Sequence, residues 1–185
     1  MRAFIGIELP DVIKNNIFNT LQEKGFYNYP NLTFVKKENF HITIAFLGDQ
    51  NKEELLEKLD FIQDFKNNFF SYNFPFSAYS IGAFPNRRKP SVIWIGIKDY
   101  HDILTGVGQL IYNELFLRGI IEMKYFKPEK HYKPHITVAR NRKRQFIPLK
   151  KFYYSEYGTF SIKYITLFES KLTPNGPIYT IIKRF

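Results

Sequence analysis

The stretch His41-Ile42-Thr43-Ile44-Ala45 decides how this chain folds, because it returns almost unchanged as His135-Ile136-Thr137-Val138-Ala139. Read as β-strands, both copies place successive side chains on opposite faces. The histidine, the threonine and the alanine of each copy then share one face, and the two aliphatic residues share the other. We therefore expect each strand to bury its aliphatic face and to present an imidazole and a hydroxyl on the opposite side.

Two further blocks repeat around this pair, so the duplication extends beyond the motif. Gly25 lies sixteen residues before the first histidine, and Gly119 lies sixteen residues before the second. Three ordered blocks in register indicate one duplicated unit. The repeated blocks are Phe4–Glu8 with Trp94–Lys98, Leu21–Phe26 with Leu115–Ile120, and the two histidine stretches.

The repeated blocks predict similar elements in both copies. The apolar runs at 4–8 and 94–98 are typical of buried strands. Each is followed by a segment with helical spacing of apolar residues, the first starting at Pro10, and a glycine ends each helix. The residues expected on the buried helix faces are Ile13, Ile17 and Leu21 in the first copy and Ile103, Val107, Leu110, Ile111 and Leu115 in the second.

After the histidine stretches the two copies diverge. We expect a helix at about 52–66, an extended segment at 70–84, and strands at about 159–169 and 177–184 joined by the turn Pro174-Asn175-Gly176. The fold class is therefore α+β: an internally duplicated bilobal fold in which two antiparallel-sheet lobes with outer helices face a central cleft. One domain spans 1–185, with repeat units at about 1–85 and 90–185.

Composition narrows the class of protein. The 185 residues and 22.1 kDa fit one domain, and 44% hydrophobic residues with ten glycines and ten prolines exclude a disordered chain. No apolar run is long enough to span a membrane, which favours a cytoplasmic protein. The absence of cysteine excludes disulfides, thiol nucleophiles and cysteine-ligated zinc. A net charge of +10 favours polyanionic partners, nucleic acid first, although a basic surface also serves solubility alone.

If a pseudo-twofold axis relates the lobes, two imidazoles and two hydroxyls surround one point. That set suits acid–base chemistry on a phosphodiester without a metal or cofactor. One neutral imidazole takes a proton from the attacking group and one imidazolium protonates the leaving oxygen, while the threonine hydroxyls bind the non-bridging oxygens. Duplication without function would also preserve similar strands, but it explains less well why a histidine and a threonine persist in both. Metal binding by His131 and His135 is disfavoured because Pro134 interrupts a helix between them.

At these residues the sequence resembles the 2H phosphoesterase superfamily, named for two His-x-[Thr/Ser]-x motifs. It is most similar to the RNA 2′,3′-cyclic phosphodiesterase branch, also called 2′-5′ RNA ligase, and the resemblance implies the bilobal LigT-like fold. The likeness runs nearly end to end. The stretches that carry it are 2–4, 41–48, 82–85 with Pro90, 132–140, 169–170, Pro174 and 176–179.

The resemblance implies the substrate and the roles of the motif residues. The substrate is RNA ending in a 2′,3′-cyclic phosphate, transfer RNA halves among the options, and the product is a 2′-phosphate. His41 is the proton donor, His135 is the proton acceptor, and Thr43 and Thr137 contact the phosphate. No nucleotide cofactor is needed, since the strained ring drives the reaction, and reversible 2′-5′ ligation of RNA ends is a further expectation. With an internal twofold, a monomer needs no partner.

Four other residues are candidate RNA contacts. Arg140 matches a family position linked to phosphate, but strict alternation turns it away from the His135 face unless a bulge or the end of the strand brings it back. Tyr132 stands where the family more often has phenylalanine. Arg87 and Arg88 lie in a basic loop that is either an RNA track or simply solvated. Two rival functions stay open: a module that binds RNA ends or a nucleotide without turnover, and a phosphodiesterase for a small cyclic or 2′-5′-linked nucleotide.

Overall fold

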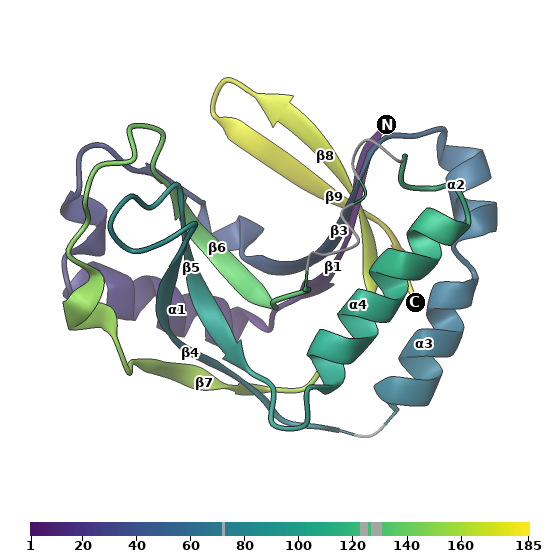
Figure 1. Ribbon diagram of the computed structural model, residues 1–185, viewed down its shortest axis with the longest axis horizontal. Coiled ribbons are helices and arrows are strands. Elements are labelled where there is room, and N and C mark those ends of the chain that lie inside the picture. Colours follow the sequence, from purple (N-terminus) through teal and green to yellow (C-terminus); the bar gives the residue numbers. More distant parts are fainter. Residues whose placement is uncertain (72, 123–125, 127–130) are drawn as a thin grey trace.

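A single curled antiparallel sheet with helices at both ends forms the protein in the computed structural model, which describes residues 1–71, 73–122, 126 and 131–185 (Figure 1). The main path of the sheet has the order β7-β4-β5-β6-β3-β1-β8-β9, and β2 pairs with β6 off this path. Among the described residues, no helix is both long and apolar enough to cross a membrane. The α+β class and the duplicated antiparallel sheet are thus as predicted.

The bounds of the elements are as follows. The strands are β1 (Arg2–Glu8), β2 (Thr33–Phe34), β3 (His41–Asp49), β4 (Phe76–Phe84), β5 (Val92–Lys98), β6 (His135–Arg140), β7 (Glu156–Phe160), β8 (Thr166–Thr173) and β9 (Gly176–Arg184). The helices are α1 (Asp11–Glu23), α2 (Lys52–Lys58), α3 (Phe61–Phe69) and α4 (Ile103–Leu117), with 3-10 turns η1 (Phe26–Asn28), η2 (Lys37–Asn39) and η3 (Leu149–Phe152).

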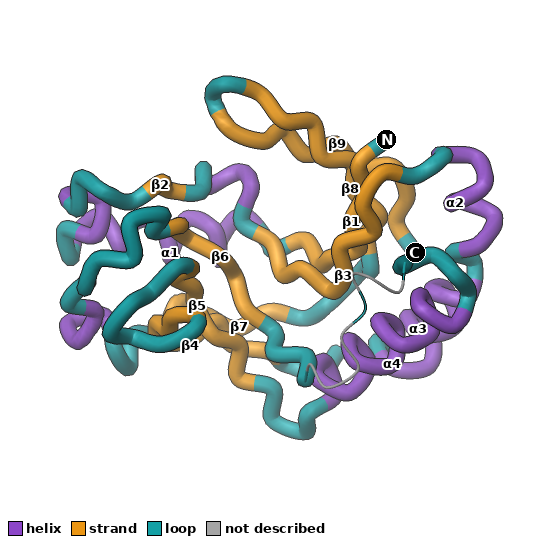
Figure 2. Tube along the Cα trace, turned by 45° about the horizontal axis from the view of Figure 1, so that its top comes forward, coloured by secondary structure: helices purple, strands orange, loops and turns teal. Residues whose placement is uncertain are grey.

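The strand order is symmetric about the middle of the sheet when β1 is matched with β5 and β3 with β6. The repeated strands β1 and β5 lie beside β3 and β6, and β3 and β6 meet at the middle of the sheet. We call β3, β1, β8 and β9 the first half-sheet, and β6, β5, β4 and β7 the second. The second is built from one stretch of the chain, from β4 to β7, whereas the first combines β1 and β3 with β8 and β9 from the C-terminal part. Figure 2 shows the strands running from one helical end of the molecule to the other.

Each of the two long helices packs on one half-sheet, while the strand that precedes it in the chain belongs to the other. Helix α1 follows β1 but packs on β7, where the Asn16 side chain donates a hydrogen bond to the Tyr157 carbonyl at 3.0 Å. Helix α4 follows β5 but packs on β3 and on α3. In Figure 1, α1 lies behind β4 and β5, whereas α3 and α4 flank the side that carries β1 and β3. The half-sheets are therefore interlocked by their helices.

The two helices predicted within the repeats form where the sequence indicates. The first is preceded by Pro10 and followed by Gly25, whose φ of 69° is the left-handed conformation that favours glycine. In α4 the prediction for Leu110 is wrong, because this side chain is exposed and Leu104 is buried in its place. Gly108 also has a reason beyond its cost to the helix: a Cβ there would lie only 2.2 Å from the ring of Tyr132.

Three other predicted segments differ from the observed elements. The helix expected at 52–66 is two helices, because a turn at Leu59–Asp60 lets Phe61 also become buried, under the guanidinium of Arg118. The run expected at 159–169 is split into β7 and β8, since those strands lie in different half-sheets and the chain must cross between them. The extended segment expected from residue 70 begins as β4 at Phe76.

Candidate active site

The two histidine motifs meet where β3 pairs with β6, at Ile42 and Ile136. Both isoleucine side chains are fully buried, so they face the core. Directly paired residues of antiparallel strands point to the same side, and the residues that flank them point to the other. His41, Thr43, His135 and Thr137 flank this isoleucine pair and are all partly exposed. They share one face of the sheet, which we call the site face.

The separation of the two histidine Cα atoms follows from this register. His41 and His135 are diagonal neighbours across the strand pair, and diagonal Cα atoms lie about 7–8 Å apart. The positive charge of His135 acts on the pKa of His41, which agrees with that proximity. Only one residue pair joins β3 to β6 in the part of the chain that the structure describes, because β2 pairs with the far end of β6. The strands therefore diverge beyond the two motifs.

A β-bulge follows each motif and changes which residues share its face. Ile44 is the extra residue in β3 and Val138 is the extra residue in β6. In both strands the next residue, Ala45 or Ala139, is buried, so the prediction that these alanines lie beside the histidines is wrong. The bulge in β6 places Arg140 on the site face, where its charge opposes the rise in the pKa of Tyr179 that burial causes.

Each imidazole is oriented by a backbone carbonyl two residues earlier. The Nδ1 atom of His41 lies 2.7 Å from the Asn39 oxygen, and the Nδ1 atom of His135 lies 2.7 Å from the Lys133 oxygen. A carbonyl only accepts hydrogen bonds, so both Nδ1 atoms carry the proton. In the neutral rings Nε2 is then the basic nitrogen. The Nε2 atom of His41 lies 2.9 Å from the Thr43 hydroxyl.

Aromatic rings surround both imidazoles in a matching arrangement. His41 packs against Phe4, Tyr179 and Phe168, with ring centres 4.9, 5.2 and 6.1 Å away. His135 packs against Phe84 and Trp94 at 5.1 and 6.0 Å. Phe4 and Trp94 occupy the same position in the two repeats, and Phe168 and Phe84 come from the strands next to theirs.

This apolar environment controls the charge of His41. Burial is the main cause that lowers the pKa of His41 to about 4, with smaller contributions from the positive charges of His135 and Lys14. The hydrogen bond to the Asn39 carbonyl acts in the opposite direction. His41 is therefore neutral at pH 7. A bound anion would favour its protonated form.

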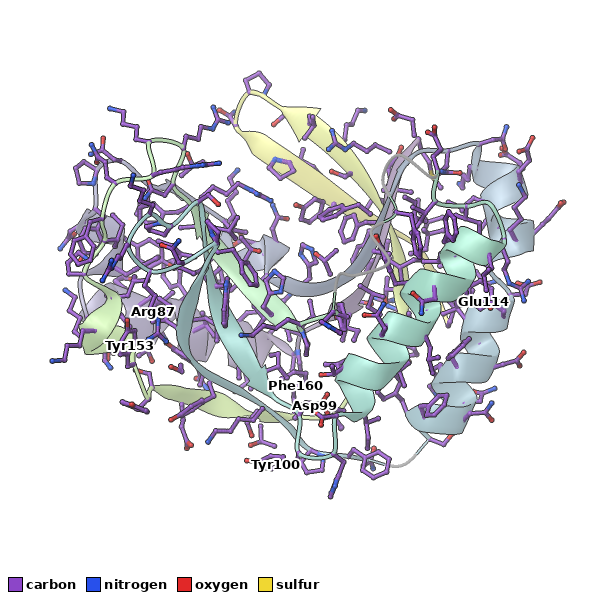
Figure 3. The ribbon with its side chains drawn as sticks, viewed as in Figure 1. Arg87, Asp99, Tyr100, Glu114, Tyr153 and Phe160 are labelled. Atoms are coloured by element: carbon purple, nitrogen blue, oxygen red, sulfur yellow. The ribbon has the colours of Figure 1, made fainter. Side chains whose placement is uncertain are left out.

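The remaining predicted contacts are less closely associated with the site. The Tyr132 hydroxyl donates a hydrogen bond to the Thr43 carbonyl at 3.1 Å, which ties the segment before His135 to β3. Arg87 lies over the ring of Tyr153, 4.2 Å from its centre, and Figure 3 labels the two together. Arg88 is exposed in the same loop. Within the described ranges, no three His, Asp or Glu side chains are grouped so as to hold a metal ion.

Sequence reasoning did not find the residues that orient and enclose the imidazoles. Asn39 and Lys133 precede their histidines by two residues in both repeats, and that matching position was the available signal. The aromatic residues that enclose the imidazoles are distant from the histidines along the chain, and only the strand order brings them together. These residues are Phe84, Trp94, Phe168 and Tyr179.

Comparison with known proteins identifies the class to which this fold and site belong. The model of the family described as LigT like Phosphoesterase matches residues 7–94 and 117–179, which include both histidine motifs. Among solved structures, TT0787 of Thermus thermophilus has a TM-score of 0.73 at 22% identity, covering 100% of this chain and 97% of that one. E. coli LigT complexed with 3′-AMP has a TM-score of 0.71 at 21% identity, covering 100% and 96%. The chain belongs to the LigT-like, or 2H, phosphoesterase family and is an enzyme.

Curated relatives narrow the comparison within the family. The RNA 2′,3′-cyclic phosphodiesterase of Methanocaldococcus jannaschii is 36% identical over 193 aligned residues, which cover 100% of both chains. The RNA 2′,3′-cyclic phosphodiesterase of Archaeoglobus fulgidus is 31% identical over 188 aligned residues, covering 100% of this chain and 99% of that protein.

Proposed function

We propose that this protein is an RNA 2′,3′-cyclic phosphodiesterase that opens the cyclic phosphate at an RNA end to a 2′-phosphate. The observation that carries the proposal is the arrangement of the two histidines. They flank the Ile42–Ile136 pair on one face, and each has Nδ1 at 2.7 Å from the carbonyl two residues earlier. The names of the relatives in M. jannaschii and A. fulgidus support the choice of substrate.

In the proposed reaction the two imidazoles transfer protons on opposite sides of the phosphorus. Water attacks phosphorus while Nε2 of His135 takes one of its protons. The bond from phosphorus to O3′ breaks, and Nε2–H of His41 gives its proton to that oxygen. The products are a 2′-phosphate and a 3′-hydroxyl. Lys133 supports the acceptor role, because its carbonyl holds the proton of His135 on Nδ1 and leaves Nε2 basic.

His41 must be protonated before it acts as the acid. Its pKa of about 4 keeps it neutral until an anion binds beside it. The cyclic phosphodiester carries one negative charge, and an opposite charge within about 4–6 Å raises the pKa of a histidine. Substrate binding thus prepares the acid. The Asn39 carbonyl accepts a hydrogen bond from Nδ1–H and so stabilises the imidazolium.

Three further residues are proposed to bind the phosphate or the RNA. The hydroxyls of Thr43 and Thr137 would donate hydrogen bonds to the non-bridging oxygens, where negative charge increases in the transition state. Arg140 would contact an RNA phosphate from the end of β6. Both catalytic histidines come from one chain, which supports a monomeric enzyme. If an RNA 5′-hydroxyl replaces water, the same groups form a 2′-5′ linkage.

The proposal is tested by identifying the product. An RNA oligonucleotide with a 2′,3′-cyclic phosphate end, a nucleoside 2′,3′-cyclic phosphate and a 2′-5′-linked dinucleotide are incubated separately with the protein, and the products are analysed by phosphorus NMR. We expect a 2′-phosphate as the only product from the two cyclic phosphates. We also expect a higher kcat/KM for the oligonucleotide than for the nucleoside cyclic phosphate, because the basic residues contact its backbone.

Each other outcome identifies a rival. Binding of the cyclic-ended RNA without turnover contradicts the enzyme and supports a binding module. Preference for the 2′-5′-linked dinucleotide supports a phosphodiesterase for small nucleotides. A 3′-phosphate product means that O2′ is the leaving group, and the roles assigned to His41 and His135 are then reversed.

Removal of metal ions should leave the activity unchanged, because the two histidines supply both the acid and the base. The measurement is the rate of cyclic phosphate opening in the presence of excess EDTA, compared with the untreated enzyme. Loss of activity that is restored by a divalent cation would contradict a metal-independent mechanism.

A further inference from the structure

One asparagine links His41 to a hairpin that is distant in sequence. The backbone oxygen of Asn39 accepts a hydrogen bond from Nδ1–H of His41 at 2.7 Å. The side-chain amide of the same residue donates a hydrogen bond to the Pro177 carbonyl at 2.8 Å, 138 positions along the chain. Pro177 lies near the tip of the β8–β9 hairpin, which extends away from the rest of the sheet in Figure 1.

The same hairpin also packs on the imidazole itself. Tyr179 follows Pro177 by two residues, so the two side chains lie on the same face of β9. The Tyr179 ring stands edge-on to the His41 ring, with centres 5.2 Å apart and planes at 85°. Tyr179 also packs on Phe4, with ring centres 5.0 Å apart, and the Phe4 ring in turn lies 4.9 Å from the His41 ring. The hairpin therefore positions one of the aromatic rings that pack on this imidazole.

Asn39 is placed so that its two hydrogen bonds depend on each other. It is the last residue of η2, and Phe40, which separates it from His41, is extended and buried. Because the backbone of Phe40 is held in place, the Asn39 carbonyl moves only if Asn39 itself moves. The Asn39 backbone N–H donates to the Lys36 carbonyl at 2.9 Å, and the side-chain amide on Pro177 ties the same residue to the hairpin. Loss of the amide bond therefore loosens the carbonyl and the hairpin relative to each other.

The second repeat supports this role of Asn39, because Lys133 at the equivalent position also combines a backbone contact to a histidine with a side-chain contact. The Lys133 carbonyl orients His135, and the Lys133 ammonium lies 4.7 Å from the centre of the Trp94 ring. Trp94 in turn packs on His135. In both repeats, the backbone carbonyl of the residue two positions before the histidine orients Nδ1. The side chain of that residue makes a second contact: Asn39 binds the hairpin that carries Tyr179, and Lys133 lies against the Trp94 ring.

We propose that Asn39 is a positioning residue for the acid: its carboxamide holds the β8–β9 hairpin and the carbonyl that together fix the orientation and tautomer of His41. The inference rests on the proposed function, in which His41 donates a proton from Nε2. Asn39 does not need to touch the substrate. Its effect is therefore expected in kcat rather than in KM.

The test compares Asn39→Ala and Asn39→Asp with Asn31→Ala. Asn39→Asp keeps the shape of the side chain but has no N–H to donate. Asn31→Ala is the matched control, because it removes an amide hydrogen bond of the same length, to Gln145, in another loop. We expect both Asn39 variants to lower kcat about fivefold to tenfold, as for loss of one hydrogen bond, with KM within about twofold. The control keeps the wild-type kcat.

A spectroscopic measurement separates positioning from a general loss of structure. Nitrogen-15 NMR of the histidine rings reports which nitrogen carries the proton. We expect the wild-type His41 signal to be that of the Nδ1–H tautomer and the Asn39 variants to show a mixture of tautomers, with the His135 signal unchanged. An unchanged His41 signal together with an unchanged kcat overturns the inference. If Asn39→Ala does not fold, Asn39→Asp decides in the same way.

A His41→Gln background distinguishes this inference from the proposed function. If His41→Gln abolishes activity while the Asn39 variants match wild type, only the inference fails. If His41→Gln retains activity, the proposed role of His41 as the acid fails, and the NMR result alone decides whether Asn39 orients the ring. When both hold, Asn39→Ala adds no further loss to His41→Gln, since the two residues act through one group.

Discussion

Replacement of His41 or His135 by alanine is expected to lower kcat for cyclic phosphate opening by about 10²–10⁴-fold, because each variant loses one proton transfer. This factor corresponds to an activation barrier higher by about 3–5 kcal/mol. The two losses should not add in the double variant, since the histidines act in one step. The measurement is kcat on an RNA oligonucleotide with a cyclic phosphate end.

His101→Ala is the matched control, because this histidine is exposed and lies in the turn before α4. It should retain the wild-type kcat. Retention of more than about a tenth of the wild-type kcat in either site variant would remove that histidine from the proton transfers. A loss in His101→Ala of the same size would show that the assay reports stability and not chemistry.

Acidification is expected to destabilise the wild-type protein more than a His41→Gln variant. The pKa of His41 is lowered to about 4 in the folded protein, against about 6.5 for an unperturbed histidine. The unfolded chain therefore binds a proton below pH 6.5 that the folded chain does not bind until about pH 4. The stability that this residue contributes is present above pH 6.5 and is lost as the pH falls toward 4.

The size of the effect follows from the same linkage. Between pH 7 and pH 4.5, the free energy of unfolding should fall by about 2 kcal/mol more in the wild type than in His41→Gln. Urea titrations at the two pH values measure the difference, and His101→Gln serves as the control with an exposed ring. Equal acid sensitivity of wild type and His41→Gln would mean that burial does not hold His41 neutral.

The duplicated sheet and the face that carries the histidines were predictable, because both depend on local patterns. The alternation of His41, Ile42 and Thr43 selects a buried face and an open face whatever the strand pairs with. The repeat then indicates that two such strands exist. The strand order and the Ile42–Ile136 pair were not predicted, because they depend on contacts between distant segments that only the structure shows.

Features that depend on pairing between distant strands were not predictable. The bulges at Ile44 and Val138 move the following alanines into the core and Arg140 to the site face, but a bulge is defined by the partner strand and not by the residue. Similarly, nothing near Asn39 in the sequence indicates a contact with Pro177. The aromatic content was also ambiguous: Phe4 is buried, yet its ring lies against His41 and contributes to its desolvation.

The exchange of helices between half-sheets has a consequence for how the catalytic centre can be lost. A polypeptide ending near residue 90 would contain β1 and β3 but neither the C-terminal hairpin that completes their sheet nor the helix α4 that covers β3. The complementary piece would contain β5 and β6 without β4 and α1. Neither piece could bury its own hydrophobic surface, so the molecule cannot melt one lobe at a time. Unfolding and inactivation are then a single cooperative event.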